Sequence, residues 1–259
     1  RNFLGRSGTK DAEVYLVGSA VAAFAALSGE VVDLSGSDIP VVDIPESYFV
    51  DDSMVVKPNS EGDVIKGPNI KDLPKFGEVN DLKGKVTIKV GDKITTDDIM
   101  PAGPRLKYRS NVEKYSSFVF ELVDDKFVER ALENKEKGVG NVIIAGLSYG
   151  QGSSREHAAL CPANLGVKAV IAKSIERIHL QNLINFGIIP LFFKDESDYD
   201  KIELGDELEI NNLKEGLKEK KGLFLVNKTK NFKIELNSPI TDKDIDILLK
   251  GGKLNYYGA

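Results

Sequence analysis

Strand and helix patterns alternate regularly through the middle of this chain. Continuous apolar segments predict strands and the segments between them predict helices: strands at 141–146, 169–172 and 188–193, and helices at 155–161 and 178–186. Strand, helix and strand at this spacing indicate parallel strands joined by right-handed crossovers. The pattern therefore predicts an α/β domain, in which ligands bind at the carboxyl ends of the strands.

The last part of the chain changes to alternating apolar and polar residues. This pattern predicts strands at 207–210, 223–226 and 232–236. A closing helix follows, which we expect Thr241 to cap, with Asp244 three residues later, and Gly251 to end. Segment 214–221 alternates in charge and indicates a solvated turn. Together with the parallel part, these strands predict a mixed sheet.

The first 35 residues carry a single strand and helix unit. Residues 14–17 predict a short strand, and Ser19 is a candidate N-cap for a helix over 20–27 that Gly29 ends. One such unit is too small to be a domain. We therefore expect residues 1–35 to be the tail of an upstream α/β domain, and the sequence to be a fragment.

Regular patterns are absent between residues 36 and 85. Five of the ten prolines fall in this stretch, with many Asp, Ser and Gly residues. This composition predicts a long linker between domains. Periodicity returns with a strand pattern at 86–90 and a second one at 93–99. We therefore expect the main domain to span residues 86–259.

Charge and composition exclude several partners. The net charge is −5 with no block of Lys and Arg, which argues against nucleic acid and anionic membranes. The longest apolar run, residues 20–27, is far too short to span a bilayer, and no secretory signal opens the sequence, so we expect a cytoplasmic protein. The single cysteine, Cys161, excludes an internal disulfide and any metal site of three or four cysteines.

The segment YGQGSSREH at 149–157 carries the clearest chemical pattern. It lies between the strand that ends near Gly146 and a helix that we expect to begin near Ser154. Two glycines let the backbone approach a ligand, helix N–H groups attract an anion, and Arg155 adds a two-donor fork for a carboxylate or phosphate. A purely structural alternative is that one of the serines caps the helix and that Arg155 is solvated.

A serine in this setting can act as a base. Its alkoxide needs neighbouring donors and positive charge, which helix N–H groups and Arg155 supply. His157 lies four residues past Ser153, on the same face of the expected helix. The Gly-x-Ser-x-Gly elbow of hydrolases is absent, which disfavours Ser-His nucleophilic catalysis.

Several motifs together resemble the C-terminal swivelling domain of the aconitase family, which includes homoaconitases and isopropylmalate dehydratases. The motifs are YGQGSSREHAAL at 149–160, AKSIERIH at 172–179, GDKITTDDIMPAGP at 91–104, LKYR at 106–109 and RNFLGR at 1–6. The resemblance implies a three-layer β/β/α domain with a mixed sheet, preceded by the linker and by the tail of a cluster-bearing domain. It also implies that this domain closes over the cluster.

The resemblance implies a role for individual residues. Ser153 would be the alkoxide base, and Ser154 and Arg155 would hold substrate carboxylates. Arg109 matches the arginine that binds a carboxylate in the members that use tricarboxylates. The remaining matches are Asp97, in the proton-handling network, and the arginine pair Arg1 and Arg6, which the preceding domain contributes to the same pocket. The residue after Asp97 is often His in aconitases and is Asp98 in this chain.

The resemblance also implies a [4Fe–4S] cluster that acts as a Lewis acid and is held by three cysteines of the earlier domains. Those cysteines are absent from this chain, and Cys161 is expected to be a small buried residue rather than a ligand. His179 lies on a predicted helix, where a histidine is more often structural, and it is not included among the site residues.

The resemblance implies the C-terminal part of an aconitate hydratase, which would interconvert citrate and isocitrate through cis-aconitate. Its partners would be a small tricarboxylate and the cluster-bearing domains of the same enzyme, without which the chain would be inactive. One alternative is a homoaconitase or a 3-isopropylmalate dehydratase small-subunit-like domain. Another is an anion-binding α/β module without activity.

Overall fold

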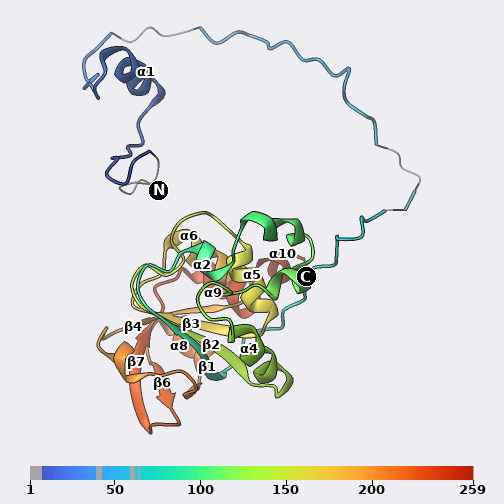
Figure 1. The fold of residues 1–259 in the computed structure, drawn as a ribbon, viewed down its shortest axis with the longest axis vertical. Helices are drawn as coiled ribbons and strands as arrows, with labels where there is room; N and C mark the ends of the chain where they lie inside the picture. The colour runs from blue at the N-terminus through green and yellow to red at the C-terminus, as the bar shows by residue number, and fades with distance from the viewer. Residues whose placement is uncertain (1–7, 39–42, 59–61, 64, 259) are drawn as a thin grey trace. The chain divides into compact units, whose positions relative to one another are not determined.

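The computed structural model describes residues 8–38, 43–58, 62–63 and 65–258 (Figure 1). The chain divides into two units, residues 1–64 and residues 65–259. The second unit therefore includes residues 65–85, which the composition had assigned to the linker.

The first unit contains one helix, α1 (Ser19–Ser28), within its described residues. The helix ends as expected at Gly29, which has a left-handed conformation (φ 79°) and donates its N–H to the Ala25 carbonyl at 2.9 Å. Its N-cap is Gly18, because Ser19 is already helical. The strand expected at 14–17 does not form. No neighbouring strand pairs with these residues within the described part of the unit, and Leu16 is largely exposed.

The second unit is built on seven strands that close into a barrel. The strands are β1 (Leu82–Val90), β2 (Gly140–Ala145), β3 (Val167–Ala172), β4 (Ile189–Phe193), β5 (Glu207–Ile210), β6 (Leu223–Asn227) and β7 (Phe232–Asn237). They follow the order β1-β2-β3-β4-β7-β6-β5, and β5 returns to β1. The pairs from β1 to β4 are parallel and the others are antiparallel, so the mixed sheet is confirmed. The two β layers that we expected are two sides of one closed sheet.

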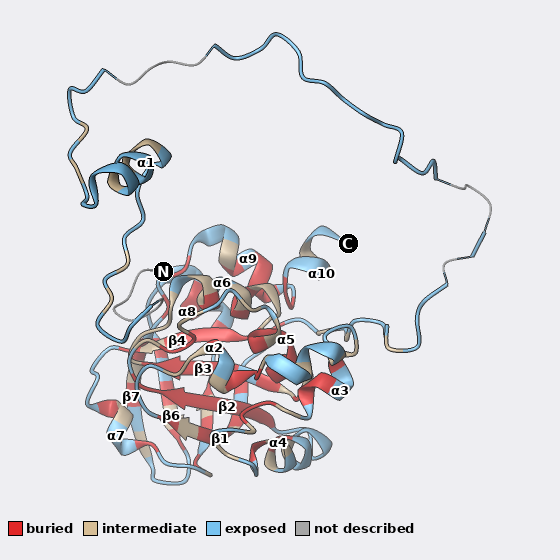
Figure 2. Cartoon of the chain, turned by 45° about the horizontal axis from the view of Figure 1, so that its top comes forward, coloured by how far each residue is buried: buried red, intermediate tan, exposed pale blue. Residues whose placement is uncertain are grey.

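Helices surround this barrel (Figures 1 and 2). They are α2 (Thr96–Ile99), the 3₁₀ helix η1 (Gly103–Tyr108), α3 (Val112–Ser116), α4 (Phe127–Glu136), α5 (His157–Asn164), α6 (Arg177–Asn185), α7 (Asp198–Lys201), α8 (Leu213–Glu219), α9 (Asp242–Leu249) and α10 (Lys253–Tyr257). Helix α4 contacts β1 and β2, α5 contacts β3, and α6 contacts β4. These crossover helices cover the outside of the parallel strands; the alternating pattern predicted α5 and α6 but not α4.

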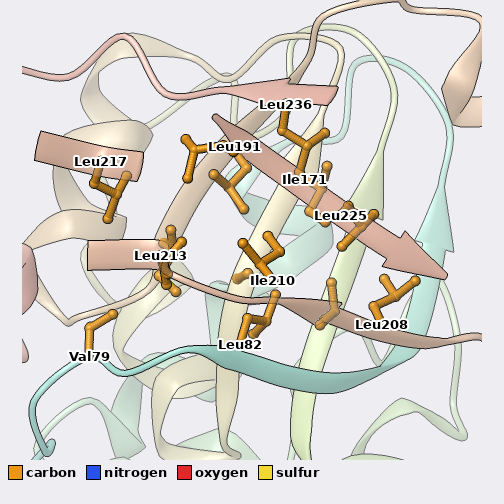
Figure 3. Packing of buried hydrophobic residues seen from close by; sticks show 14 of the residues in the cluster. Val79, Leu82, Ile171, Leu191, Leu208, Ile210, Leu213, Leu217, Leu225 and Leu236 are labelled. Atoms are coloured by element: carbon orange, nitrogen blue, oxygen red, sulfur yellow. The ribbon is translucent and has the colours of Figure 1, made fainter. Parts of the chain in front are cut away.

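The core has two parts because the parallel strands are buried on both faces. Along β2, Val142 and Ile144 belong to the cluster inside the barrel, whereas Ile143 and Ala145 pack with the helices outside it. Figure 3 shows the inner cluster, in which leucines of the antiparallel strands meet Ile171. Burial on both faces explains why these strands read as continuous apolar runs in the sequence.

Two predicted elements of the main domain are wrong and one strand is longer than expected. Residues 93–99 do not form a strand: their second half is helix α2, because Thr95 and Asp98 make a reciprocal capping box. Segment 214–221 is largely helix α8, whose buried Leu213 and Leu217 anchor it to the core. Strand β1 begins at Leu82, four residues before the expected start.

The closing helix is confirmed as α9. Its predicted cap forms, since Thr241 Oγ1 accepts the Asp244 N–H at 3.2 Å and the Asp244 carboxylate accepts the Thr241 N–H at 3.3 Å. Gly251 lies just past the helix with a left-handed conformation (φ 81°). A side chain at this position would lie 2.2 Å from the carbonyl oxygen of Gly77. Glycine is therefore required for the turn and for the close approach of the segment that precedes β1.

Candidate functional site

Three loops meet at the carboxyl ends of β1, β2 and β3. The loop after β2, residues 146–156, contains Ser153 and Ser154 and is called the serine loop below. On one side the Gly150 N–H donates to the Ile94 carbonyl at 2.8 Å, and on the other side the Tyr149 N–H donates to the Ser174 carbonyl at 3.0 Å. The helices that follow these loops, α2, α5 and α6, lie together, with α5 in contact with both others (Figure 2). The loops that carry the predicted site residues therefore meet at the edge of the sheet where the α/β pattern predicts a ligand site.

Glycine is required in the middle of the serine loop, at Gly150. Gly150 has φ +79°, and a Cβ there would lie 2.2 Å from the imidazole ring of His179. That ring is buried and lies edge-on to the buried ring of Tyr149, with 5.2 Å between centroids. His179 thus packs behind the loop, which is consistent with a structural residue.

The serines do not lie at a helix N-terminus. Helix α5 begins at His157, after an N-cap at Glu156 with no side-chain cap, so neither serine caps it. Instead, Ser153 and Ser154 are exposed in the loop before the helix. Within the described chain, the backbone N–H groups of residues 152–155 have no acceptor. Open backbone N–H groups attract anions, so an anion site here would be formed by the loop backbone rather than by the N-terminus of a helix.

Arg155 is fixed beside this loop by the short helix α2. Its Nη1 donates to the Asp97 carboxylate at 2.7 Å, to the Met100 carbonyl at 2.8 Å and to the Thr96 carbonyl at 3.3 Å. The Arg155 side chain is 14% exposed, so it is held and not merely solvated. The Thr96 hydroxyl also donates to the Ser153 carbonyl at 3.0 Å. The structure therefore brings Asp97, Ser153 and Arg155 together.

Thr96 was not identified by the sequence reasoning. Its hydroxyl and its backbone N–H both bond to the serine loop, the latter to the Gln151 carbonyl at 2.9 Å. The motif that contains Thr96 was recognised, but nothing in a sequence shows which of two adjacent threonines faces a distant loop. Thr95, its neighbour, serves the cap of α2 together with Asp98.

Arg109 follows η1 at the edge of the same region. Its side chain is exposed, and its guanidinium has no hydrogen-bond or ion-pair partner among the residues that the structure describes. Its backbone carbonyl lies 2.9 Å from His157 Nε2.

The expected placement of His157 on one helix face with Ser153 is wrong, because the helix begins only at His157. The other two predicted arginines, Arg1 and Arg6, lie outside the described residues.

The described residues do not fit an iron–sulfur cluster. They contain no group of three or more His, Cys, Asp or Glu side chains that could hold a metal ion. Cys161 is fully buried on α5, and burial raises the pKa of its thiol to about 12. A cluster ligand is a thiolate, so this cysteine is unsuited to the role.

Helices long and apolar enough to cross a membrane are absent from the described part of the chain.

Comparison with known proteins identifies the family. The family model described as the aconitase C-terminal domain matches residues 100–196. A 3-isopropylmalate dehydratase small subunit of Archaeoglobus fulgidus is 40% identical over 168 residues, which cover 65% of this chain and 90% of that protein. The chain belongs to the aconitase family.

A solved structure and a longer relative extend this result. The crystal structure of 3-isopropylmalate dehydratase from Methanocaldococcus jannaschii matches with a TM-score of 0.54 and 36% identity, covering 69% of this chain and 93% of that one. The mitochondrial aconitate hydratase of Gracilaria gracilis is 32% identical over 246 residues, or 85% of this chain. The chain spans 32% of the length of that relative. The mixed α/β fold is thus shared with an aconitase-family domain.

Proposed function

We propose that this chain is the C-terminal part of a hydro-lyase that interconverts citrate and isocitrate through cis-aconitate. The observation that supports it most directly is the Arg109 guanidinium, which is exposed and without a partner in the described chain. It lies on a segment joined to α5 by His157, and α5 directly follows the serine loop. A free guanidinium on a segment that is bonded to the helix after these open N–H donors suits a substrate with several carboxylates.

In this proposal Ser153 is the base that removes a proton from a substrate carbon. A serine hydroxyl does this only if the alkoxide is stabilised. Open backbone N–H groups and the positive charge of Arg155 provide that stabilisation in the loop. The bond from Thr96 to the Ser153 carbonyl fixes the backbone at the reacting residue. Fixing the reacting group in this way lowers the entropic cost of reaching the transition state.

The carboxylates of the substrate would be bound by Ser154, Arg155 and Arg109, with Arg1 and Arg6 contributed by the preceding part of the enzyme. The three hydrogen bonds that Arg155 makes to α2 and its C-cap all use Nη1, which leaves Nε and Nη2 for a substrate. Asp97 holds this guanidinium, and we propose that orienting Arg155 is part of its role in the proton-handling network.

The complete enzyme would carry a [4Fe–4S] cluster on residues outside this chain, where it would supply Lewis-acid chemistry. We propose that the second unit closes over it as a swivelling domain, joined through the proline-rich segment. Closure would exclude water from a site that is exposed at the serines in this chain.

A second candidate activity is 3-isopropylmalate dehydration. It is supported by the small subunit of such an enzyme, which is 40% identical to this chain over 90% of the subunit's length. Against it, the match to the aconitate hydratase covers 85% of this chain, whereas the match to the small subunit covers 65%. Assaying the complete enzyme on citrate and on 3-isopropylmalate separates the two. Turnover of citrate supports the proposal, and turnover of 3-isopropylmalate alone overturns it.

A further inference from the structure

His157 connects the start of α5 to the segment that carries Arg109. Its Nε2 lies 2.9 Å from the Arg109 carbonyl oxygen. Since a carbonyl oxygen can only accept, Nε2 carries the hydrogen and donates it. The imidazole ring also packs at 5.1 Å from the ring of Tyr115, which is fully buried on α3. The histidine is therefore held on one side by packing and on the other by a directed hydrogen bond.

The segment that ends at Arg109 packs against the core through Tyr108, whose ring stacks on that of Phe118 at 5.6 Å between centroids, and Arg109 itself lies at its exposed end. Helix η1, which leads into Arg109, contains no buried residue. Other side-chain anchors hold the residues before Arg109: Arg105 donates to the Glu121 carboxylate through two nitrogens at 3.1 Å, and Asn69 donates to the Lys107 carbonyl. The bond from His157 is the side-chain anchor at Arg109 itself. It also comes from the helix that directly follows the serine loop.

We propose that His157 is a positioning residue for substrate binding, which sets the location of Arg109 relative to the serine loop. This inference rests on the proposed function, because it takes Arg109 to bind a substrate carboxylate. His157 touches neither the reacting atoms nor the base, and it acts through the backbone of Arg109. An arginine that binds substrate and transition state alike affects KM more than kcat when it is misplaced.

Two substitutions of the same polarity test the role. In His157→Gln, the amide nitrogen reaches about as far as Nε2 and can still donate to the Arg109 carbonyl. In His157→Asn, the shorter side chain cannot reach it. In the complete enzyme with citrate, we expect His157→Asn to raise KM about tenfold with kcat within about twofold of wild type, and His157→Gln to remain close to wild type. Equal KM values for the two variants, or a collapse of kcat at unchanged KM in His157→Asn, would overturn the proposal.

Hydrogen exchange of the same variants tests the structural step without an activity assay. The amides of Arg109 and Asn111 bond to Leu106 and Tyr108 at 3.1 and 2.7 Å. We expect both amides to exchange faster in His157→Asn than in His157→Gln. Asn255→Ala is the matched control, because it removes a similar bond, to the Phe76 carbonyl, in the segment before β1. Unchanged exchange in His157→Asn would overturn the inference, whereas an inactive wild-type enzyme would count against the proposed function alone.

Discussion

Arg155 and Asp97 form an ion pair at 2.7 Å whose two members differ in exposure, 14% for the arginine side chain and 58% for the aspartate. The arginine comes from the serine loop and the aspartate from α2. Two carbonyls at the ends of α2, those of Thr96 and Met100, accept from the same guanidinium nitrogen. The arginine is therefore oriented from one side, and its other nitrogens are left for a ligand.

Replacing Asp97 with Asn should cost activity far more than stability. The carboxylate is more than half exposed, so its pairing with Arg155 contributes less than about 1 kcal/mol to folding. Misplacing a substrate-binding guanidinium lowers activity more strongly, and we expect kcat/KM on citrate to fall roughly 10- to 100-fold. Steady-state kinetics and thermal unfolding of the complete enzyme measure the two effects. A loss of stability large enough to explain the loss of activity would contradict this role.

Arg155→Lys provides the companion variant. Lysine keeps the charge and can reach a carboxylate, but it lacks the planar fork that bonds to α2 with one nitrogen and leaves others free. We expect KM for citrate to rise at least tenfold while the fold is retained. A kinetically silent Arg155→Lys would show that the guanidinium does not bind substrate.

Ser153→Ala tests the base. Removing the group that abstracts the proton should lower kcat about 10²- to 10⁴-fold, while KM changes little, because the carboxylate-binding groups remain. Ser154→Ala is the matched control, since both serines are exposed in the same loop. It should raise KM and preserve most of kcat. Full turnover in Ser153→Ala would show that this residue is not the base. A wild-type enzyme that binds citrate but does not turn it over would instead be an anion-binding module.

Arg109→Leu tests the choice of substrate. A hydrogen bond between charged groups contributes about 1.5 to 3 kcal/mol, so we expect kcat/KM for citrate to fall about 10- to 100-fold. Turnover of 3-isopropylmalate, which has an apolar side chain in place of a carboxylate, should be affected less. Competing the two substrates in one reaction measures the ratio directly. An equal loss on both substrates would contradict the assignment of Arg109 to the additional carboxylate.

Most strands of the barrel were predicted from the sequence, because the hydrophobic pattern that marks a strand lies within the strand itself. The parallel strands are buried on both faces and appear as short apolar runs, and the crossover helices lie between them. Segment 93–99 was assigned to the wrong class, since its apolar residues fit a strand pattern. The capping box of Thr95 and Asp98 favours a short helix instead.

The candidate site was less predictable because it depends on contacts between distant segments. The sequence shows a loop rich in glycine and serine, but the bonds from α2 to Arg155 and Ser153 join residues more than fifty positions apart. The start of α5 was placed too early, because nothing in the motif marks His157 as the first helical residue. An anion site at this loop stays a prediction from residue types, and its assignment to helix N–H groups is wrong for the serines, because α5 begins only at His157.

Gly150→Ala should disrupt the serine loop through steric contact. The added Cβ would lie 2.2 Å from the His179 ring, and φ is +79°. We expect a destabilisation of about 2 to 4 kcal/mol and a strong loss of activity. Gly152→Ala is the control, because it shares a positive φ, +97°, but its nearest atom would be the Thr96 hydroxyl at 3.8 Å. It should cost about 1 kcal/mol from backbone strain alone. Equal effects in denaturant titrations would show that contact with His179 is not the cause.

Cys161 should be unreactive in the folded protein and should make stability depend on pH in alkaline solution. Burial raises the pKa of its thiol from 9.0 to about 12, because an apolar surrounding disfavours the thiolate. The unfolded chain then loses this proton at a lower pH than the folded chain does. The contribution of Cys161 to stability is therefore fully present below pH 9 and decreases as the pH rises toward 12.

Alkylation with iodoacetamide at pH 8.5 checks this directly. A thiol with a pKa of about 12 is ionised about a thousandfold less than an ordinary one, so the native chain should react very slowly. The same chain in guanidinium chloride should take up one label, because it has one cysteine. Cys161→Ser, which should take up none, controls for other reactive groups. Rapid labelling of the native chain would show that α5 opens readily around Cys161, and would contradict the close packing of this helix.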